Sequence, residues 1–417
     1  MADVTIDDIR GAAAGFDASV RRTPLLASGT LSALTGGDVR LKAENLQRTG
    51  SFKIRGASNR IAALSDDERR SGVIAASAGN HAQGVAVAAA SRGIRATIVM
   101  PVTTPLAKVE ATRGYGADVV LHGESYDEAF AEAQRIGADR ALVLIPAFDD
   151  ARVVAGQGTV GLEIAGDLPE VDVVVVPVGG GGLAAGIGVA LRSRAPRARV
   201  IGVQVEAAPG VRRSLDAGRR ISVACGPTIA EGIAVSGPGD LTFPLLQRVL
   251  DDVVVVDDDE IAQAMVLLLE RSKLVAEGAG AAGVAALMSR KVDVVGKSAV
   301  VVISGGNVDI NMLARVVEHG LMQAGRYFSL TVGLDDKPGQ LALLSALLSE
   351  TGANVLSVAH HRFGIDLPVG RVQVVLLLEV RNHAHAEDVA ASLERAGFAR
   401  RAEGGGPEFV PRTWAAE

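Results

Sequence analysis

Short apolar runs alternate with amphipathic segments along most of the chain, and this alternation constrains the fold more than any other feature. Strands are predicted at residues 38–44, 72–76, 96–101, 117–122, 141–145, 171–178, 199–206 and 298–303. Helices are predicted between them at 51–64, 80–91, 105–113, 125–136, 156–165, 182–192, 257–268 and 281–288. This order favours a parallel sheet with helices on both faces. We therefore predict an α/β domain over residues 1–322, built as two lobes that share a cleft.

The pattern changes after Gly325, where buried runs give way to alternating ones. Strands are predicted at 328–334, 355–361 and 370–380, helices at 340–350 and 384–396, and a further strand near Phe409. The order β-α-β-β-α-β is that of a ferredoxin-like module. We therefore predict a second, smaller domain over residues 326–410.

Composition narrows the class of protein. A net charge of −6 and the lack of a long basic run argue against nucleic acid as a partner. A single cysteine, Cys225, allows no disulfide within the chain and fits a reduced, cytoplasmic setting. We expect no signal peptide and no membrane span, because the N-terminal segment is acidic and the apolar runs have the length of strands.

Lys53 stands at the start of a predicted helix, with Ser51 as the expected N-cap. A cation in the first turn is opposed by the partial positive charge of the helix N-terminus. Partial burial lowers the pKa of such a lysine further, and a neutral amine can attack a carbonyl to form a Schiff base. Taken alone, a lysine is far more often an ordinary solvated surface residue, and the other motifs of the chain are what favour a catalytic role.

The run Gly179–Gly182 lies between a predicted strand and a predicted helix. Four residues without Cβ allow backbone N–H groups to converge on an anion such as phosphate. The pattern Gly180-x-Gly182-x-x-Ala185, with Glu206 after the next strand, also fits a dinucleotide-binding site. An NAD-dependent dehydrogenase is therefore an alternative, although it gives Lys53 and Ser304 no role.

Two further turns follow predicted strands. In the first, residues 77–81, a hydroxyl, an amide and the N–H groups of a helix start could hold a carboxylate, or could simply cap the helix. In the second, residues 304–307, the Ser304 hydroxyl could hydrogen-bond a ring nitrogen, or the segment could be no more than a turn. Because ligands bind beyond the carboxyl ends of parallel strands, we expect both turns and the glycine run to share one site.

Four segments together carry a resemblance to a known family: Glu44–Gly56, Ser77–Gly84, Pro177–Leu183 and Ser304–Asn307. In this order they resemble the threonine ammonia-lyases, which are fold-type II enzymes dependent on pyridoxal 5'-phosphate (PLP). The resemblance covers most of residues 1–322. From about Tyr327 the chain is similar to ACT domains, which bind amino acids.

The resemblance implies a role for each motif. Lys53 would bind PLP and later remove the Cα proton of the substrate. The other residues implied in cofactor binding are Phe52 against the ring, Asn80 at the ring hydroxyl, Ser304 at the pyridine nitrogen, and Gly179, Gly180, Gly181, Gly182 and Leu183 at the phosphate. Those implied in binding the substrate carboxylate are Ser77, Asn80 and His81.

The implied reaction is the deamination of L-threonine to 2-oxobutanoate and ammonia by α,β-elimination of water, with L-serine as a slower substrate. A serine racemase or a β-replacement enzyme is an alternative on the same fold. Related racemases carry a serine where this chain has Ala78, and they bind a cation near Glu206, where Arg212 here replaces a second acid. We therefore predict neither racemisation nor a metal site.

The ACT-like segment implies regulation. A branched-chain amino acid, isoleucine above all, is the expected effector, and a dimer or tetramer is the expected assembly. A third alternative is a sensor without catalysis, in which this segment is the working part; the intact Lys53 argues against it.

Overall fold

The computed structural model describes residues 3–362 and 369–400. The packing of the backbone divides the chain into two units, Met1–Ile310 (unit 1) and Asn311–Glu417 (unit 2). Each unit has a hydrophobic core of its own. Within the described ranges, no helix combines the length and the apolar character that a membrane crossing requires.

Six strands form the larger sheet of unit 1, in the order β1-β2-β10-β7-β8-β9. Their bounds are Leu25–Ala27 (β1), Asp38–Ala43 (β2), Ser298–Ile303 (β10), Val173–Pro177 (β7), Arg199–Val205 (β8) and Asp252–Val256 (β9). Neighbours pair in parallel, except that β1 runs antiparallel to β2. Parallel pairs need long crossovers, and helices supply them here.

Helices cover both faces of this sheet. One face packs against α1 (Ile6–Ala14), α8 (Ala151–Asp167), α9 (Gly182–Arg194) and α11 (Thr242–Val249). The other face carries α13 (Gly278–Met288), where a Cβ on Gly283 would lie 2.6 Å from Val301 Cγ1. The remaining elements of this lobe are α2 (Gly29–Thr35), α10 (Gly210–Ala217), α12 (Asp258–Leu267), a π-turn (Leu268–Ser272) and short 3-10 turns (Glu44–Leu46 and Glu231–Ile233).

Four parallel strands form the second lobe, in the order β5-β4-β3-β6. They are Asp118–Leu121 (β5), Ala96–Met100 (β4), Val73–Ala76 (β3) and Val143–Leu144 (β6). One face packs against α3 (Lys53–Ala62), α5 (Asn80–Ala90) and α6 (Leu106–Gly114), and the other against α7 (Tyr126–Arg140). The small helix α4 (Asp66–Ser71) precedes β3. The predicted α/β fold with two parallel-sheet lobes is thereby confirmed.

Local capping signals in the sequence are mostly realised. Thr5, Ser125 and Asp257 each begin a helix with a reciprocal capping box. The prediction that Ser51 caps α3 is wrong, because Phe52 holds the N-cap position in helical conformation and makes no capping bond. Ser51 instead forms a β-bridge with Gly305, and its buried hydroxyl has no hydrogen-bond partner among the described residues. Tertiary pairing therefore overrides the local cap at this position.

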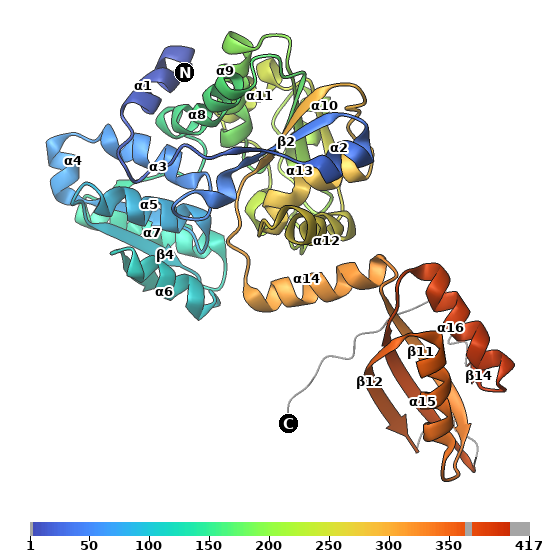
Figure 1. Cartoon of the computed structure of the whole chain (residues 1–417). Helices are drawn as coiled ribbons and strands as arrows, with labels where there is room; N and C mark the ends of the chain where they lie inside the picture. Colours follow the sequence, from blue (N-terminus) through green and yellow to red (C-terminus); the bar gives the residue numbers. More distant parts are fainter. Residues whose placement is uncertain (1–2, 363–368, 401–417) are drawn as a thin grey trace. The chain divides into compact units, whose positions relative to one another are not determined.

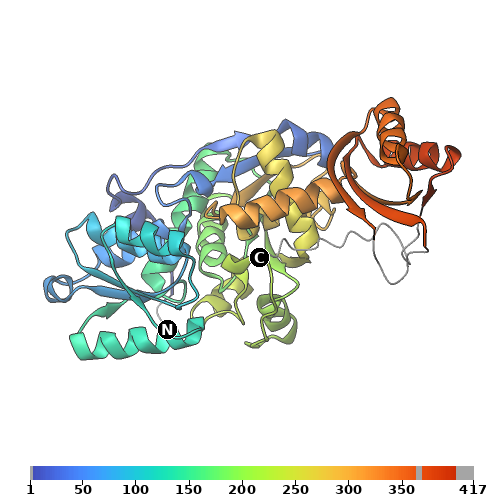
Figure 2. The ribbon, with the colours of Figure 1, turned by 90° about the horizontal axis from the view of Figure 1, so that it is seen from below.

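Unit 2 contains a four-stranded antiparallel sheet in the order β12-β13-β11-β14. Its elements are α14 (Ile310–Gln323, beginning on the last residue of unit 1), β11 (Tyr327–Asp335), α15 (Gln340–Thr351), β12 (Asn354–His361), β13 (Arg371–Glu379), α16 (His383–Arg395) and β14 (Ala399–Arg400). Both views of the ribbon show α15 and α16 on the same face of this sheet (Figure 1, Figure 2). This is the predicted ferredoxin-like order; the strand predicted near Phe409 lies outside the described residues.

Helices α8 and α9 touch backbone to backbone through glycines. A Cβ on Gly186 would lie 2.4 Å from the Val154 carbonyl oxygen and 2.6 Å from the Gly158 nitrogen. Both atoms belong to the backbone, so neither can move aside alone. We therefore expect Gly186→Ala to lower the free energy of unfolding by about 1–3 kcal/mol.

Gly11→Ala is the matched control for this substitution. Gly11 also lies within a helix, α1, but a Cβ there would meet nothing within 4 Å. The added helix propensity should leave stability unchanged or raise it by roughly 0.5–1 kcal/mol. Urea titration of both variants measures the difference, and equal stabilities would show that the glycine contact is not tightly packed.

Candidate active site

The three chemistry-bearing turns follow β3, β7 and β10, as expected for carboxyl ends of parallel strands. The turn after β10 lies directly against the start of α3. Phe52 N–H donates to the Ser304 carbonyl at 3.1 Å, and Gly306 N–H donates to the Gly50 carbonyl at 2.9 Å. Ser304 is 3 % exposed. Backbone pairing thus fixes Ser304 beside the residue that precedes Lys53.

Lys53 is the first residue of α3 and is partly buried. Its Nζ donates to the Ala147 carbonyl at 3.0 Å and lies 5.3 Å from the centroid of the Phe52 ring. Burial lowers the pKa of Lys53 to about 8, against an opposing effect of the Glu277 carboxylate. At pH 7 about one tenth of such an amine is neutral, against less than a thousandth of an ordinary lysine.

A chain of amide side chains links the start of α5 to the other turns. Asn80 Nδ2 donates to Glu277 Oε1 at 2.7 Å, and Asn307 Nδ2 donates to Asn80 Oδ1 at 2.7 Å. Asn307 is itself tied to the Thr49 carbonyl at 2.7 Å. These contacts fix the orientation of the Asn80 amide, which keeps a second N–H hydrogen for a ligand.

Glu277 is a site residue that sequence reasoning missed. It directly precedes α13, and its N–H donates to the Gly305 carbonyl at 3.1 Å. Burial raises the pKa of Glu277 to about 7, although the hydrogen bond from Asn80 opposes this. A carboxylate just before a helix of small residues was the available signal, but only the fold brings it to Asn80.

The glycine run has no space for side chains, and its backbone N–H groups are left for an anion. A Cβ on Gly180 would lie 2.4 Å from the Phe148 ring, and one on Gly181 would lie 2.6 Å from Leu246 Cδ1. Gly181 has φ +98° and is the N-cap of α9. Within the described part of the chain, the N–H groups of residues 179–182 donate to no side chain and to no carbonyl outside their own helix. Buried amides at a helix N-terminus are an anion-binding site.

The turn of residues 77–81 places Ser77 and His81 differently. Ser77 Oγ accepts the Gly79 N–H at 3.1 Å, so its own O–H hydrogen is left to donate. The His81 ring is buried, and its Nε2 lies 2.8 Å from the Ile145 carbonyl oxygen. Burial and the nearby Lys53 lower the pKa of His81 to about 3. The ring is therefore neutral and is committed to Ile145.

The residues near Glu206 do not gather around a metal. Arg212 forms ion pairs with Asp216 at 3.0 Å and Asp252 at 2.9 Å, and it donates to the Val253 carbonyl. Over residues 3–362 and 369–400, no three His, Cys, Asp or Glu side chains group as metal ligands would. The guanidinium of Arg212 thus pairs with two carboxylates that could otherwise attract a metal cation.

Comparison with known proteins identifies the family. The model of the pyridoxal-phosphate dependent enzyme family matches residues 17–306. The chain belongs to this family, and its cofactor is pyridoxal phosphate. The glycine run therefore serves a PLP enzyme, and the dehydrogenase alternative is set aside.

Individual relatives show which members of the family this chain is similar to. An L-threonine ammonia-lyase of Thermotoga maritima is 50% identical, over 96% of this chain and all of that protein. The catabolic L-threonine dehydratase TdcB of Escherichia coli is 46% identical, over 75% of this chain and 96% of its own length. The structure of maize serine racemase matches with a TM-score of 0.72 and 37% identity, over 77% of this chain and 99% of its own.

The residues present fit the cofactor. PLP needs an amine for its aldehyde, donors for its phosphate and polar groups around its ring. Lys53 supplies an amine with a lowered pKa, and the glycine run supplies buried amides without side chains in the way. Lys53 bonds to Ala147, whose neighbour Phe148 lies against Gly180 and Gly182, so amine and amides border one short segment.

The neutral His81 predicts a pH dependence of stability. In the unfolded chain this histidine binds a proton below about pH 6.5, whereas in the fold it stays neutral to about pH 3. The unfolded state therefore holds more protons at acidic pH, and stability falls as the pH falls. Between pH 7.5 and 5, we expect the wild type to lose about 2 kcal/mol more than His81→Gln, whose side chain cannot titrate.

Denaturant titrations of both proteins at several pH values, with identical cofactor content, measure this difference. Glutamine keeps an N–H donor for the Ile145 carbonyl, so the comparison isolates the proton. Parallel pH curves for wild type and variant would mean that the imidazole is hydrated in the fold.

Proposed function

We propose that this chain is an L-threonine ammonia-lyase, which removes water from L-threonine and releases 2-oxobutanoate and ammonia. The observation that carries the proposal is the placement of the Lys53 amine, with its pKa near 8, beside a buried cradle of amides. The Thermotoga relative, matched over its full length, supports threonine as the substrate. L-Serine, one methyl group smaller, is a second and slower substrate in this proposal.

The proposed cofactor contacts follow the site geometry. Gly179, Gly180, Gly181, Gly182 and Leu183 would hold the phosphate through backbone N–H groups. Phe52 would pack on the ring, because it directly precedes Lys53. Ser304 is held beside Phe52 and would meet the ring nitrogen, and Asn80 would use its second N–H hydrogen for the ring hydroxyl.

The substrate carboxylate would bind at the start of α5. Ser77 offers its O–H hydrogen, and Asn80 and His81 offer backbone N–H groups in the first turn of the helix. His81 would take part only through its backbone, because its ring is bonded to Ile145. A Cβ on Gly79 would meet nothing within 4 Å, which leaves space at this turn.

Proton transfer falls to Lys53. When bound, the cofactor supplies a ring that takes up the negative charge left on the substrate carbon. With a pKa near 8, Lys53 is a neutral base for a useful fraction of the time at pH 7 and can take the proton from Cα. Glu277 holds Asn80 in place and, with a pKa near 7, does so whether or not it carries a proton itself.

Serine racemisation is the competing activity, and the likeness to maize serine racemase favours it. Racemisation needs a proton donor or acceptor on each face of the substrate carbon. The residue between Ser77 and Gly79 is Ala78, whose methyl group can do neither. Elimination from one face is therefore the activity that this site supports better.

Borohydride reduction and peptide mapping test the assignment of Lys53. We expect the pyridoxyl group on Lys53, and we expect Lys53→Ala to lower the release of 2-oxobutanoate from threonine by at least roughly 10²–10⁴-fold, because anchor and base are lost together. Lys297→Ala, at a lysine before β10 that pairs with Asp293, is the control and should keep wild-type activity.

Two outcomes would contradict the proposal. A pyridoxyl group on another lysine would remove Lys53 from the reaction. Conversion of L-serine to D-serine by the wild type, as fast as its conversion to pyruvate, would make the chain a racemase.

For unit 2 we propose the role of an ACT-like regulatory domain, within predicted bounds of 326–410, beside a catalytic domain predicted over 1–322. The match to Escherichia coli TdcB covers 96% of that protein but only 75% of this chain, whereas the Thermotoga match covers 96% of this chain. An extra unit with its own core is suited to a separate task. Isoleucine, a branched-chain amino acid whose carbon descends from threonine, is the proposed effector.

The turn at Gly352 does not by itself define the effector site. Gly352 N–H donates to the Ser349 carbonyl at 3.2 Å, and Ala353 N–H donates to Thr351 Oγ1 at 3.4 Å. Both amides are thus engaged inside the turn, so neither is left to bind the carboxylate of an effector. The proposal for unit 2 rests on the fold of the unit and on the lengths of the relatives.

Self-association is proposed through the edge of the same sheet. Strand β12 pairs with β13 and with no other strand of the described residues. Its side chains Val355, Leu356 and Val358 are about 40 % exposed or more. Two copies of an open, apolar edge can pair around a two-fold axis, which gives a homodimer or a dimer of dimers.

The single cysteine, Cys225, is exposed and fits a cytoplasmic enzyme.

Truncation of the chain after Gly325, which removes the ACT-like part of unit 2 and leaves α14, tests the regulatory role. A typical coupling of about 1–3 kcal/mol predicts that isoleucine shifts the apparent threonine affinity of the full chain by roughly 5- to 150-fold. The truncated protein should keep its activity and lose this response. If calorimetry shows no binding of isoleucine or valine to the full chain, and both proteins have the same kinetics, unit 2 is not an amino-acid sensor.

A further inference from the structure

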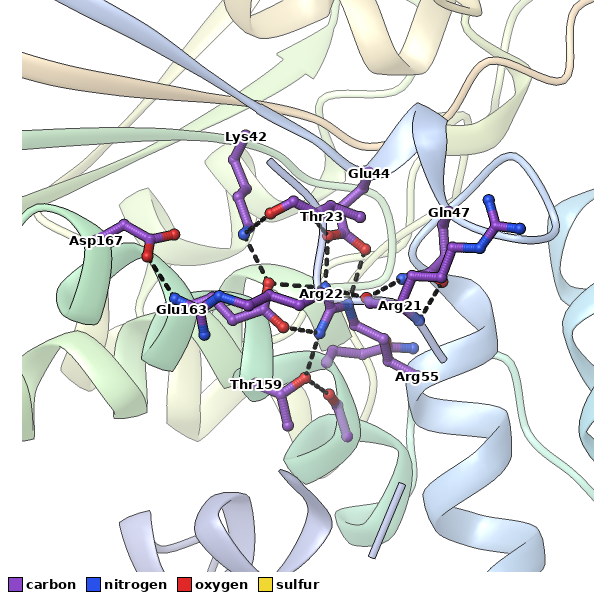
Figure 3. A network of polar contacts seen from close by, with 12 residues as sticks. Arg21, Arg22, Thr23, Lys42, Glu44, Gln47, Arg55, Thr159, Glu163 and Asp167 are labelled. Carbon is purple, nitrogen blue, oxygen red and sulfur yellow. Dashed lines mark hydrogen bonds and ion pairs between the residues drawn. The ribbon is translucent and has the colours of Figure 1, made fainter. Parts of the chain in front are cut away.

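We propose that a buried clamp, formed by Arg55 with Glu44, Glu163 and Thr159, sets the position of Lys53, so that Arg55 is a positioning residue of the reaction. The proposal rests on the role given to Lys53 above. Figure 3 shows the clamp, in which side chains from the 3-10 turn Glu44–Leu46 and from α8, together with the backbone carbonyl of Arg21, surround the guanidinium of Arg55. Arg55 lies two residues after Lys53, in the same first turn of α3.

The guanidinium of Arg55 uses its whole fork. It donates to both oxygens of Glu44, each at 2.8 Å, and to both oxygens of Glu163, at 2.6 and 3.0 Å. Thr159 Oγ1 and the Arg21 carbonyl accept the other two bonds, at 3.1 and 3.2 Å. Arg55 and Glu44 are fully buried, and Glu163 is 12 % exposed. Nη2 has two hydrogens for three of these acceptors, so one hydrogen is shared. Few orientations of the helix turn can satisfy so many acceptors at once.

The charges around the clamp balance. Lys42 Nζ bonds to Glu163 Oε2 at 2.6 Å and to the Thr23 carbonyl at 2.7 Å, and the Thr23 hydroxyl bonds to Glu44. Two cations therefore meet two carboxylates. Burial opposes the charge of Arg55, but Glu44 and Glu163 hold the pKa of the guanidinium above its ordinary value. Burial raises the pKa of Glu163, but Arg55 and Lys42 lower it more.

Beside the clamp, α3 and α8 touch backbone to backbone. A Cβ on Gly156 would lie 2.6 Å from the Arg55 carbonyl oxygen, and one on Gly56 would lie 2.3 Å from Gln157 Nε2. Gly56 N–H donates to Gln157 Oε1 at 3.1 Å, and Thr159 Oγ1 donates to the Gly156 carbonyl at 2.7 Å. The first turn of α3 is thereby fixed against one turn of α8.

The segment that directly precedes α8 connects this helix to the active site. The segment of residues 147–150 just before α8 holds Ala147, the acceptor of the Lys53 amine, and Phe148, which lies against Gly180. Asp149 accepts the N–H groups of residues 240–242, and the Thr242 hydroxyl bonds to the Gly180 carbonyl at 2.7 Å. The clamp thus sets the distance between Lys53 and the glycine run through α8.

Stability alone does not call for such a clamp. A buried ion network is often no more stabilising than apolar side chains of the same shape, but it tolerates few alternative geometries. Arg55 also places a second cation at the N-terminus of α3, where the helix opposes positive charge. A fork that bridges two carboxylates across three elements is useful where an exact helix position matters, and α3 carries the proposed catalytic amine.

Arg55→Lys tests the clamp in the full chain loaded with PLP. Lysine keeps the charge but cannot bridge Glu44 and Glu163 together. We expect kcat for threonine to fall by roughly 10- to 100-fold at temperatures well below melting, with a much smaller change in KM, because a displaced base weakens the reaction more than binding. The pH at which the visible absorbance of the bound cofactor titrates should shift as well.

Arg192→Lys is the matched control. Arg192 also bridges a carboxylate and carbonyls, those of Asp251, Val249 and Ala198, but it lies in the last turn of α9 and bonds to neither α3 nor α8. This variant should keep the wild-type kcat and the wild-type absorbance titration. Thr159→Val, which removes one bond to Arg55 without burying a charge, should give a smaller fall in kcat and a smaller shift in the same direction.

The results separate the two proposals. If borohydride maps the pyridoxyl group to a residue other than Lys53, the proposed function fails and the clamp loses its purpose. If the group is on Lys53, but Arg55→Lys and Thr159→Val change melting temperature without changing kcat or the absorbance titration, the clamp is structural only. Should Arg55→Lys not fold, Thr159→Val decides alone, and wild-type kinetics there would overturn the inference.

Discussion

The fixed position of the first turn of α3 is the constraint that the surrounding elements of unit 1 satisfy. In the proposed reaction this end of the helix presents an amine with a lowered pKa, and the amine carries no bond to a carboxylate among the described contacts. Lys53 is bonded to a carbonyl, that of Ala147, and burial disfavours its charged form. A direct ion pair with Glu277 would have raised its pKa instead, and Glu277 is turned toward Asn80. The surrounding elements therefore hold the amine in place without pairing it with a carboxylate.

Charge is distributed unevenly around this amine. The clamp on one side of α3 is rich in paired charges. The active-site side holds neutral groups, which are the glycine amides, Ser77, Asn80 and the His81 ring, together with the carboxyl of Glu277, whose pKa is raised to about 7. A second fixed cation on the active-site side of α3 would lower the pKa of Lys53 further, but it would also compete with the glycine amides for the phosphate. Neutral dipoles can bind the anion and leave the proton equilibrium of the amine to burial.

Local chemistry explains what the sequence could predict. Glycines after a valine strand, a serine turn after β3 and a lysine near a helix start are short-range signals, and each lies where expected. Ser51 was misjudged, because its pairing with Gly305 spans some 250 residues and outweighs a local cap. Glu277 and Glu163 were missed for the same reason: 197 positions separate Glu277 from Asn80, and 108 separate Glu163 from Arg55. A buried charge shows its partner only in the fold.

The two units also differ in how they use buried polar groups. In unit 1, charged side chains such as Arg55, Lys42 and Glu44 are fully buried, and each is bonded. The core that joins β11, β13, α15 and α16 is built from apolar side chains, and the buried polar side chain beside it, among the described residues, is that of His385, whose Nε2 lies 2.8 Å from the Thr351 carbonyl oxygen. Apolar packing tolerates small shifts between a sheet and its helices, whereas a bridged guanidinium does not. An apolar core of this kind suits the regulatory role proposed for unit 2, and the buried ion network suits the proposed need to hold the Lys53 nitrogen in one position in unit 1.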